Sequence, residues 1–479
     1  MSNKKKRIVI LGAGPAGLTA AYELSKNKDV DVQLIEIAGQ VGGMARSFKL
    51  FNQTVDVGPH RFFSSDPRIN NLWLEVVGKD YKMVNRITRI YYKNKFFNYP
   101  LKAFNALANL GLWETFLCLW SYLISKINPP KVINNFENWV VSRFGHRLYS
   151  IFFKDYTEKL WGIPCTKLGT EFAEQRIKKF SLGEAIISLL PFGKNKHKTL
   201  VDQFAYPLGG NGETYVKMSK LFEANNGQLY LNIAANSIDF SEEKSTYTLS
   251  LSNGITLECD ELISTMPITN LISIFSASSE KIKEHASHLT FRNTLILYVN
   301  ISKENLFKDQ WLYIQDNSAI CGRITNFNNW VPEIQVGNEG NTVLALEYWC
   351  FENDAIWNKS EKDLQQIALK DLKTCNFITS DAEVIGFNSL KVPKCYPIYF
   401  GDYKKHLDEI ISFFKAFKGL QLIGRYGSFK YNNQDHSILM GILAAQNIIN
   451  GANNNLWEIN TDYEYQESST ITATGLSVD

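Results

Sequence analysis

The chain lacks several features that would narrow its class at once. It has 7 cysteines among 479 residues, and no two of them form a CxxC pair, so we expect neither a disulfide framework nor a metal site. The net charge is only +3 and no long basic tract is present, which argues against a nucleic-acid partner. The basic run Lys4–Arg7 leads straight into an apolar strand, without the hydrophobic core of a signal peptide. The scattered, unpaired cysteines fit a reducing cytosol, so we expect a cytoplasmic protein.

Long hydrophobic runs are also missing. The most apolar stretch, Leu110–Ile127, is short for a transmembrane helix and carries Glu114 near its start, so we expect no membrane span. A helix buried in the core explains this stretch best. A helix that lies on a membrane surface is the alternative, and the sequence leaves it open.

The order of the elements predicts an α/β fold. Residues 8–11, 15–26 and 30–36 read as strand, helix and strand, and residues 420–424 read as a further buried strand before a helix. Strands of one sheet that lie so far apart in the chain imply a discontinuous, Rossmann-like nucleotide-binding domain with inserted helical and mixed or antiparallel sheet domains. The expected parts are 1–70, 196–285 and 391–455 for the nucleotide-binding domain, 71–195 for a mainly helical insertion, 286–390 for a sheet domain that binds substrate, and 456–479 for a disordered tail.

A glycine-rich turn joins the first strand to the first helix. Gly12, Gly14 and Gly17 form the GxGxxG pattern, in which the glycines allow a tight turn, close approach of a pyrophosphate and close helix packing. The N-terminus of the following helix offers free N–H groups to phosphates. Glu36 ends the second strand about 20 residues further on, where a carboxylate accepts hydrogen bonds from ribose hydroxyls. This combination predicts a dinucleotide site.

A second glycine pair favours FAD over NAD. Gly42 and Gly43 follow Glu36 closely, and the segment Gly42–Arg46 resembles the extended fingerprint of flavin amine oxidases, protoporphyrinogen oxidases and UDP-galactopyranose mutases. Many of those oxidases have Arg where this chain has Met44. The resemblance implies an FAD site formed by Gly12, Gly14, Ala16, Gly17, Glu36, Gly42, Gly43, Met44, Ala45, Arg46, Gly58, Pro59, Ala235, Gly424, Gln434 and Ser437.

Segments beyond the two glycine-rich turns resemble the UDP-galactopyranose mutase family in their order along the chain. The segments that carry this resemblance are Gly58-Pro59-His60, Tyr156–Gly162 (YTEKLWG), Arg176, Gly322–Phe327, Tyr396–Ile398 (YPI) and Gly424–Ser437 with its run NQDHS. The last segment is the most specific, and it resembles eukaryotic-type mutases. Trp311, Trp330 and residues 341–358 have no counterpart that we can assign.

The resemblance implies a nucleotide-sugar mutase that uses reduced FAD. In that family the flavin N5 forms an adduct with the sugar as UDP leaves, and ring opening and reclosure exchange pyranose for furanose. It implies catalytic roles for His60 and Arg425. It also implies a substrate pocket formed by Tyr156, Trp161, Arg176, Arg323, Tyr396, Tyr431 and Asn433. NAD(P)H is a reductant that such an enzyme could use.

Two other interpretations stay open. Related flavoenzymes oxidise or desaturate amines, porphyrinogens or polyenes, and they commonly place an acid where this chain has Arg425. A catalytically silent flavoprotein that acts as a scaffold is the third interpretation, because a fold alone does not establish a function.

Overall fold

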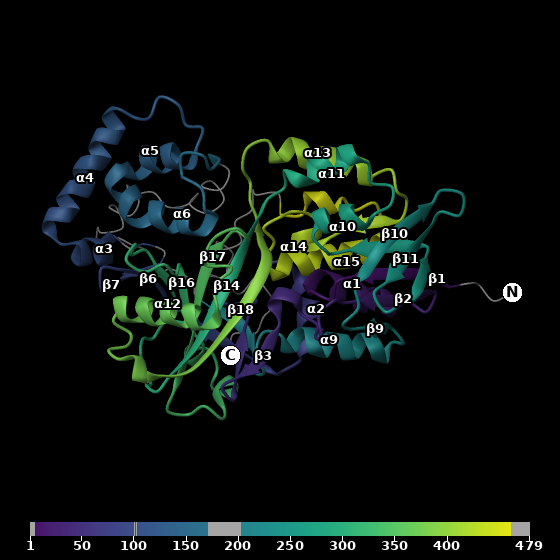
Figure 1. Cartoon of the computed structure of the whole chain (residues 1–479), viewed down its shortest axis with the longest axis horizontal. Helices are drawn as coiled ribbons and strands as arrows, with labels where there is room; N and C mark the ends of the chain where they lie inside the picture. The colour runs from purple at the N-terminus through teal and green to yellow at the C-terminus, as the bar shows by residue number, and fades with distance from the viewer. Residues whose placement is uncertain (1–4, 100, 102, 171–202, 461–479) are drawn as a thin grey trace.

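A computed structural model describes residues 5–99, 101, 103–170 and 203–460 of the chain. The molecule has three parts: a parallel sheet covered by helices, a large second sheet beside it, and a helical region at the far end of that second sheet (Figure 1).

A five-stranded sheet with the order β19-β13-β1-β2-β9 forms the nucleotide-binding part, and all its strands are parallel. The strands are β1 (Lys6–Leu11), β2 (Val30–Ile35), β9 (Gln228–Tyr230), β13 (Glu261–Ser264) and β19 (Leu420–Leu422). Ile8 and Ile10 of β1 belong to one hydrophobic core, whereas Val9 and Leu11 belong to another. Both faces of the sheet are therefore covered, as a parallel sheet requires.

Helices cover one face of this sheet and a smaller sheet covers the other. The first layer holds α1 (Pro15–Ser25), α2 (Pro67–Val77), α9 (Glu213–Ala224) and α15 (Gln434–Asn450). The second layer holds the antiparallel strands β10 (Ala235–Ser241), β11 (Thr246–Leu251) and β12 (Thr256–Cys259), with α10 (Ile268–Ile274), α11 (Glu280–Ser287) and α13 (Tyr403–Phe414). The predicted α/β class with a discontinuous nucleotide-binding domain is confirmed.

The second sheet has seven strands in the order β18-β14-β17-β16-β15-β6-β7, antiparallel except where β15 pairs with β6. Its strands are β6 (Thr88–Tyr92), β7 (Lys95–Asn98), β14 (Phe291–Ile301), β15 (Trp311–Ile314), β16 (Arg323–Asn326), β17 (Thr342–Cys350) and β18 (Val384–Pro397). Helix α12 (Glu361–Thr374) packs on one face, and the other face turns toward the nucleotide-binding part (Figure 1).

Short elements connect these parts. Two strand pairs lie near the junction: β3 (Ser47–Leu50) with β4 (Gln53–Asp56), and β5 (Tyr81–Asn85) with β8 (Gln203–Pro207). One-turn helices occupy Gly43–Ala45, Phe327–Asn329, Pro332–Gln335, Asp381–Glu383, Leu456–Glu458 and α14 (Gly424–Gly427).

The helical region contains α3 (Ala103–Leu110), α4 (Leu112–Ile127), α5 (Phe136–Tyr149), a π-helical turn (Ser150–Lys154) and α6 (Asp155–Trp161). The structure differs from the expected helical character of 71–195 at residues 81–98. These residues form β5, β6 and β7, and the last two extend the second sheet. The boundaries of the domains remain a prediction.

The expectation that Leu110–Ile127 is buried is wrong. Helix α4 has two buried residues, Cys118 and Ser125, while Trp113 is 73% exposed and Ile127 is 84% exposed. The reason is its position: α4 lies at the outer end of the molecule and packs against α5 along one side (Figure 1). None of the described helices is both long and apolar enough to cross a membrane.

The expected disorder of 456–479 is wrong for its first five residues. Leu456 is buried, and the Lys430 ammonium donates hydrogen bonds to the carbonyls of Trp457 and Ile459. Asn460 donates to the carbonyl of Tyr431 at 3.1 Å. These contacts hold the segment against the loop that follows α14. Residues 461–479 lie outside the described part of the chain.

Candidate functional site

The predicted glycine turn lies between β1 and α1. Gly12 has a φ of +97° and donates its N–H to the Ile35 carbonyl at 2.7 Å. A Cβ atom at Gly17 would lie 2.0 Å from the Gly12 carbonyl oxygen. Larger residues at these two positions would therefore separate the helix from the sheet.

The start of α1 has room for an anion. Gly14 is the N-cap residue, no side chain caps the helix, and Pro15 follows it. A Cβ atom at Gly14 would contact only the Cα of Gly43, at 3.9 Å, among the atoms around it. The free N–H groups of the first turn therefore face space that a pyrophosphate can fill.

Glu36 is buried and braces the glycine turn. Its Oε2 accepts a hydrogen bond from the Ala13 N–H at 2.7 Å, and its Oε1 accepts from the Ala38 N–H at 2.9 Å. Each carboxylate oxygen keeps acceptor capacity beyond these bonds. The contact of Glu36 with a ribose stays a prediction.

A second helix starts at the same site. Asn433 caps α15, and its backbone N–H donates to His436 Nδ1 at 3.1 Å. Asp435 is 2% exposed, and its Oδ2 has no hydrogen-bond partner among the described residues. A buried carboxylate oxygen without a donor is costly, and the hydroxyl groups of an FAD molecule would supply donors. Gln434 is fixed by Tyr215, whose hydroxyl donates to it at 2.6 Å.

These elements enclose one cavity of about 680 Å³, within the size range of cofactor and ligand sites. The structure brings most of the predicted residues to its wall: Gly12, Gly14, Ala16, Glu36, Gly43, Met44, Ala45, Pro59, His60, Ala235, Arg323, Tyr396, Gly424, Arg425, Tyr431, Asn433, Gln434 and Ser437. The remaining described candidates lie directly beside wall residues in the chain or in space: Gly17, Gly42, Arg46, Gly58, Tyr156 and Trp161. Arg176 lies outside the described residues.

An aromatic cluster lines the cavity beyond the glycine turns. The rings of Tyr396 and Tyr431 stack with centroids 5.3 Å apart, and Trp161 of α6 meets Tyr431 edge-on at 6.3 Å. Tyr156 lies behind the wall, edge-on to Tyr313 and Trp349. Tyr396 and Tyr431 line the cavity, with Trp161 and Tyr156 packed behind its wall, so a flat or ring-shaped ligand can stack on an apolar, supported surface.

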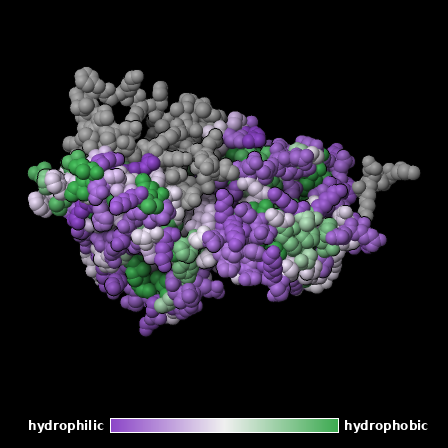
Figure 2. Space-filling view, turned by 90° about the horizontal axis from the view of Figure 1, so that it is seen from above, coloured by the Kyte–Doolittle hydropathy of each residue, from purple (hydrophilic) through white to green (hydrophobic). Residues whose placement is uncertain are grey.

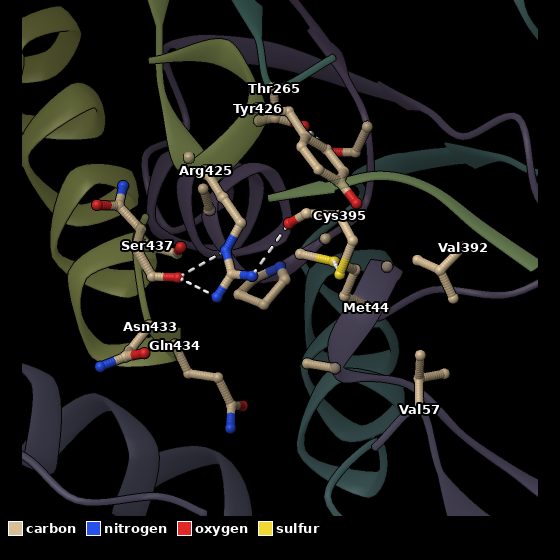
Figure 3. A pocket seen from close by; sticks show the side chains of 18 of the residues that line it. Met44, Val57, Thr265, Val392, Cys395, Arg425, Tyr426, Asn433, Gln434 and Ser437 are labelled. Carbon is tan, nitrogen blue, oxygen red and sulfur yellow. Dashed lines mark hydrogen bonds between the residues drawn. The ribbon is translucent and has the colours of Figure 1, made fainter. Parts of the chain in front are cut away.

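Arg425 projects between α15 and β18 (Figure 3). Its Nε and Nη2 donate to the Asn432 carbonyl at 2.8 and 2.6 Å, and its Nη1 donates to the Cys395 carbonyl at 3.2 Å. The guanidinium also lies 4.8 Å from the centre of the Tyr431 ring. No carboxylate among the described residues forms a salt bridge with it, so its positive charge is available to a ligand.

Arg323 is more constrained than its sequence motif indicates. Its Nε donates to Glu347 Oε1 at 2.7 Å and its Nη2 donates to Oε2 at 2.5 Å. Burial by itself lowers the pKa of Arg323, but the charge and hydrogen bonds of Glu347, together with the nearby Tyr396 and Tyr156, raise this pKa well above its usual value. The pair with Glu347 occupies Nε and one N–H of Nη2. Both N–H groups of Nη1 and the second of Nη2 are left for a phosphate, on a guanidinium whose orientation Glu347 fixes.

His60 is held neutral. Burial, followed by the charges of Arg425 and Arg323, lowers the pKa of His60 to about 3. Its Nδ1 lies 3.3 Å from the Gly58 carbonyl oxygen, which is consistent with an Nδ1–H donor. Its Nε2 would then be an acceptor at neutral pH.

Glu347, Asp435 and Tyr313 are among the wall residues that sequence reasoning missed. Asp435 belongs to the NQDHS run, and an acid at the start of a predicted helix is the signal that could have identified it. Glu347 and Tyr313 are single residues of apolar strands, and only the pairing of β15, β16 and β17 places them beside Arg323.

The comparison with known families decides the class. Residues 15–449 match the family described as flavin containing amine oxidoreductase. The chain belongs to this family. FAD is its cofactor, and the cavity fits FAD: it has open space at Gly14, an uncapped helix start and an unpartnered Asp435 oxygen.

Relatives of known sequence include oxidases of porphyrinogens. The flavoprotein is 23% identical over 418 residues to the coproporphyrinogen III oxidase of Bacillus subtilis (strain 168), covering 80% of this chain and 86% of the relative. A shorter match of 67 residues is 36% identical to protoporphyrinogen oxidase 2 of Arabidopsis thaliana, and it covers 14% of this chain and 13% of that protein.

Solved structures share the fold. Reduced UDP-galactopyranose mutase superposes with a TM-score of 0.82 at 22% identity, covering 96% of each chain. A protein described as a putative protoporphyrinogen oxidase from Exiguobacterium sp. 255-15 superposes with a TM-score of 0.72 at 17% identity, covering 93% of this chain and 99% of that one. At these identities the likeness establishes the fold, not the reaction.

Proposed function

We propose that this flavoprotein is a nucleotide-sugar mutase that interconverts the pyranose and furanose forms of a UDP-sugar. The observation that carries the proposal is Arg425, a cation without a carboxylate partner among the described residues, which faces the aromatic cluster of Trp161, Tyr396 and Tyr431. A buried diphosphate needs such a cation, and the aromatic surface suits a sugar or base ring. The likeness to reduced UDP-galactopyranose mutase over 96% of both chains supports the same interpretation.

The parts of the cavity take different tasks in this proposal. FAD would lie along Gly14, Glu36 and the start of α15, and in its reduced form it supplies the electron pair that attacks the sugar. Arg425 and the free Nη1 of Arg323 would hold the phosphates of the UDP group as it leaves and returns. Arg176 is a further proposed phosphate contact. Tyr156, Trp161, Tyr396, Tyr431 and Asn433 would shape the sugar site and exclude water.

His60 would act as a neutral hydrogen-bonding group. Because its pKa is lowered to about 3, it stays uncharged at neutral pH. With Nδ1 directed at the Gly58 carbonyl oxygen, Nε2 can accept a hydrogen bond from a ligand group. Such an acceptor suits an N–H donor of the cofactor. The contact with Gly58 would fix the orientation of the His60 ring before substrate enters.

A second candidate function is oxidation of a porphyrinogen. The match to the Bacillus subtilis oxidase over 80% of this chain favours it. Carboxylates of such a substrate would also be attracted by Arg425 and Arg323. The two reactions differ in their use of electrons, because an oxidase reduces its flavin in every turnover and a mutase regains the reduced flavin.

The test is to supply UDP-galactopyranose to protein that has been reduced once under anaerobic conditions, and to look for a furanose product. A parallel reaction offers coproporphyrinogen III to oxidised protein in air and measures hydrogen peroxide. Furanose formation without peroxide supports the mutase. Peroxide released together with porphyrin supports the oxidase and overturns the proposal.

A further inference from the structure

Helix α4 carries an uncovered apolar face. Leu112 is 93% exposed, Trp113 73%, Phe116 54%, Trp120 56% and Ile127 84%. With Leu119, Leu123 and Ile124, which are also exposed, these residues follow the three- and four-residue spacing of one side of a helix. Figure 2 shows hydrophobic residues gathered at the end of the molecule where Figure 1 places α4.

Aromatic rings form a row along this face. The centroids of Trp113 and Phe116 lie 6.0 Å apart, and those of Phe116 and Trp120 lie 6.4 Å apart, with nearly parallel planes in both pairs. Tryptophan prefers the boundary between lipid headgroups and acyl chains, where an apolar ring with one polar N–H is favourable. Exposed tryptophans one above another are therefore better suited to a bilayer surface than to water.

The opposite side of α4 is fixed to the protein. The Arg147 guanidinium of α5 pairs with the Glu114 carboxylate, and Ser121 Oγ accepts a hydrogen bond from the Arg147 N–H at 3.0 Å. Gly145 lets the two helices approach, since a Cβ atom there would lie 2.6 Å from the Tyr122 nitrogen. The apolar face therefore points outward from a rigid support.

The region around α4 is basic. Residues 93–154 contain eight lysines and arginines and two glutamates, a net charge of +6, although the whole chain carries only +3. Lys95 lies beside the end of α3, where its ammonium donates to the Asn109 carbonyl at 2.6 Å. Lys126 and Lys131 are exposed at the other end of α4, and Arg143 is exposed on α5. This charge complements a surface of anionic lipid.

We propose that the α4 face docks the protein on a lipid bilayer that contains anionic lipids. The helix has 16 residues, too few to span a bilayer, but its apolar side can enter the headgroup boundary while the flanking basic residues meet lipid phosphates. The proposed membrane contact involves only α4 and the basic residues near it. It is therefore independent of the reaction that takes place in the cavity.

The full-length flavoprotein tests this by flotation with vesicles of phosphatidylcholine alone or with roughly 30% phosphatidylglycerol added. We expect binding to the anionic vesicles, weak binding to neutral ones, and release in about 0.5 M NaCl. The double variant Trp113→Glu/Trp120→Glu should bind at least about tenfold less. The matched control Val336→Glu/Ile385→Glu, at residues 68% and 56% exposed elsewhere on the surface, should bind like the wild type.

The flavin absorbance and the thermal unfolding of each variant show whether it has folded. Since the lipid and salt dependence is measured on the wild type, it does not depend on the variants. Failure of the wild type to bind anionic vesicles would overturn the proposal. So would light scattering that shows a dimer which the α4 variant, but not the control, converts to monomer without any lipid binding, because the face would then join two copies of the chain.

Discussion

At the scale of single residues, the two arginines of the cavity differ in their partners. Arg323 and Glu347 are removed from water as a pair, with two short hydrogen bonds between them. Arg425 is held by backbone carbonyls and keeps its charge for a ligand. The two arginines of the cavity therefore have different surroundings, and their substitutions should have different effects.

Replacing Arg323 with Ala should lower the free energy of unfolding by about 3–5 kcal/mol, because it leaves the Glu347 carboxylate buried without a partner. The double variant Arg323→Met/Glu347→Leu should recover most of this loss, since no charge remains buried. Urea denaturation of the FAD-loaded proteins measures both effects. A single variant as stable as the wild type would show that water reaches Glu347 freely.

Replacing Arg425 with Ala should weaken the binding of UDP on the order of 30- to 150-fold, as expected for the loss of a charge-assisted contact worth about 2–3 kcal/mol. The UDP affinity of Arg425→Lys should lie between those of the wild type and the Ala variant, because lysine keeps the charge but not the planar fork. Calorimetric titration with UDP measures the affinities. Equal UDP affinity in the wild type and the Ala variant would contradict a phosphate role for Arg425.

Asp56 links stability to pH. Its carboxylate is fully buried beside Ser47 and Tyr206, and burial raises its pKa from 3.8 to about 7 despite those hydrogen bonds. A folded pKa above the unfolded one means that the native state holds the proton longer, so stability should fall as pH rises from about 4 to about 7 and level off above that. Asp56→Asn should remove this component, on the order of 4 kcal/mol at most. Parallel pH profiles of urea denaturation for the two proteins would rule it out.

At the scale of elements, the glycine turn and α1 were predictable because their constraints are local. Gly12 has a φ of +97°, and a Cβ atom at Gly17 would lie 2.0 Å from the Gly12 carbonyl oxygen. Both constraints arise within one strand–helix unit, so the local sequence pattern reflects them. Position 14 differs from Gly12 and Gly17. Its φ of −74° suits any residue, and its side-chain direction is open apart from Gly43.

Gly14→Val should therefore fold yet purify without colour, because the new side chain would occupy the space of the pyrophosphate. Absorbance near the flavin bands and thermal unfolding of the apoprotein measure the two properties separately. A yellow Gly14→Val protein would contradict the placement of FAD at the start of α1.

Elements whose character depends on distant partners could not be predicted in the same way. The apolar residues of α4 suit a buried helix, and only the position of α4 at the outer end of the molecule leaves them exposed. Residues 81–98 sit in a segment with helical surroundings, but β6 pairs with β15, more than two hundred residues away. The position of Glu347 next to Arg323 likewise follows from strand register, which one sequence does not reveal.

At the scale of the whole molecule, one cavity joins a flavin site of family type to a basic, aromatic pocket. The family match establishes that the chain is a flavoprotein. Its sequence relatives include a porphyrinogen oxidase, and its fold is shared with UDP-galactopyranose mutase. The choice between these reactions depends on whether electrons leave the protein during turnover.

The most direct measurement is the number of furanose molecules formed per FAD after a single anaerobic reduction, with UDP-galactopyranose as substrate. The mutase proposal predicts many turnovers from reduced protein, none from fully oxidised protein, and a flavin that is still reduced at the end. Equal product from oxidised protein, or peroxide released in step with product, would contradict it.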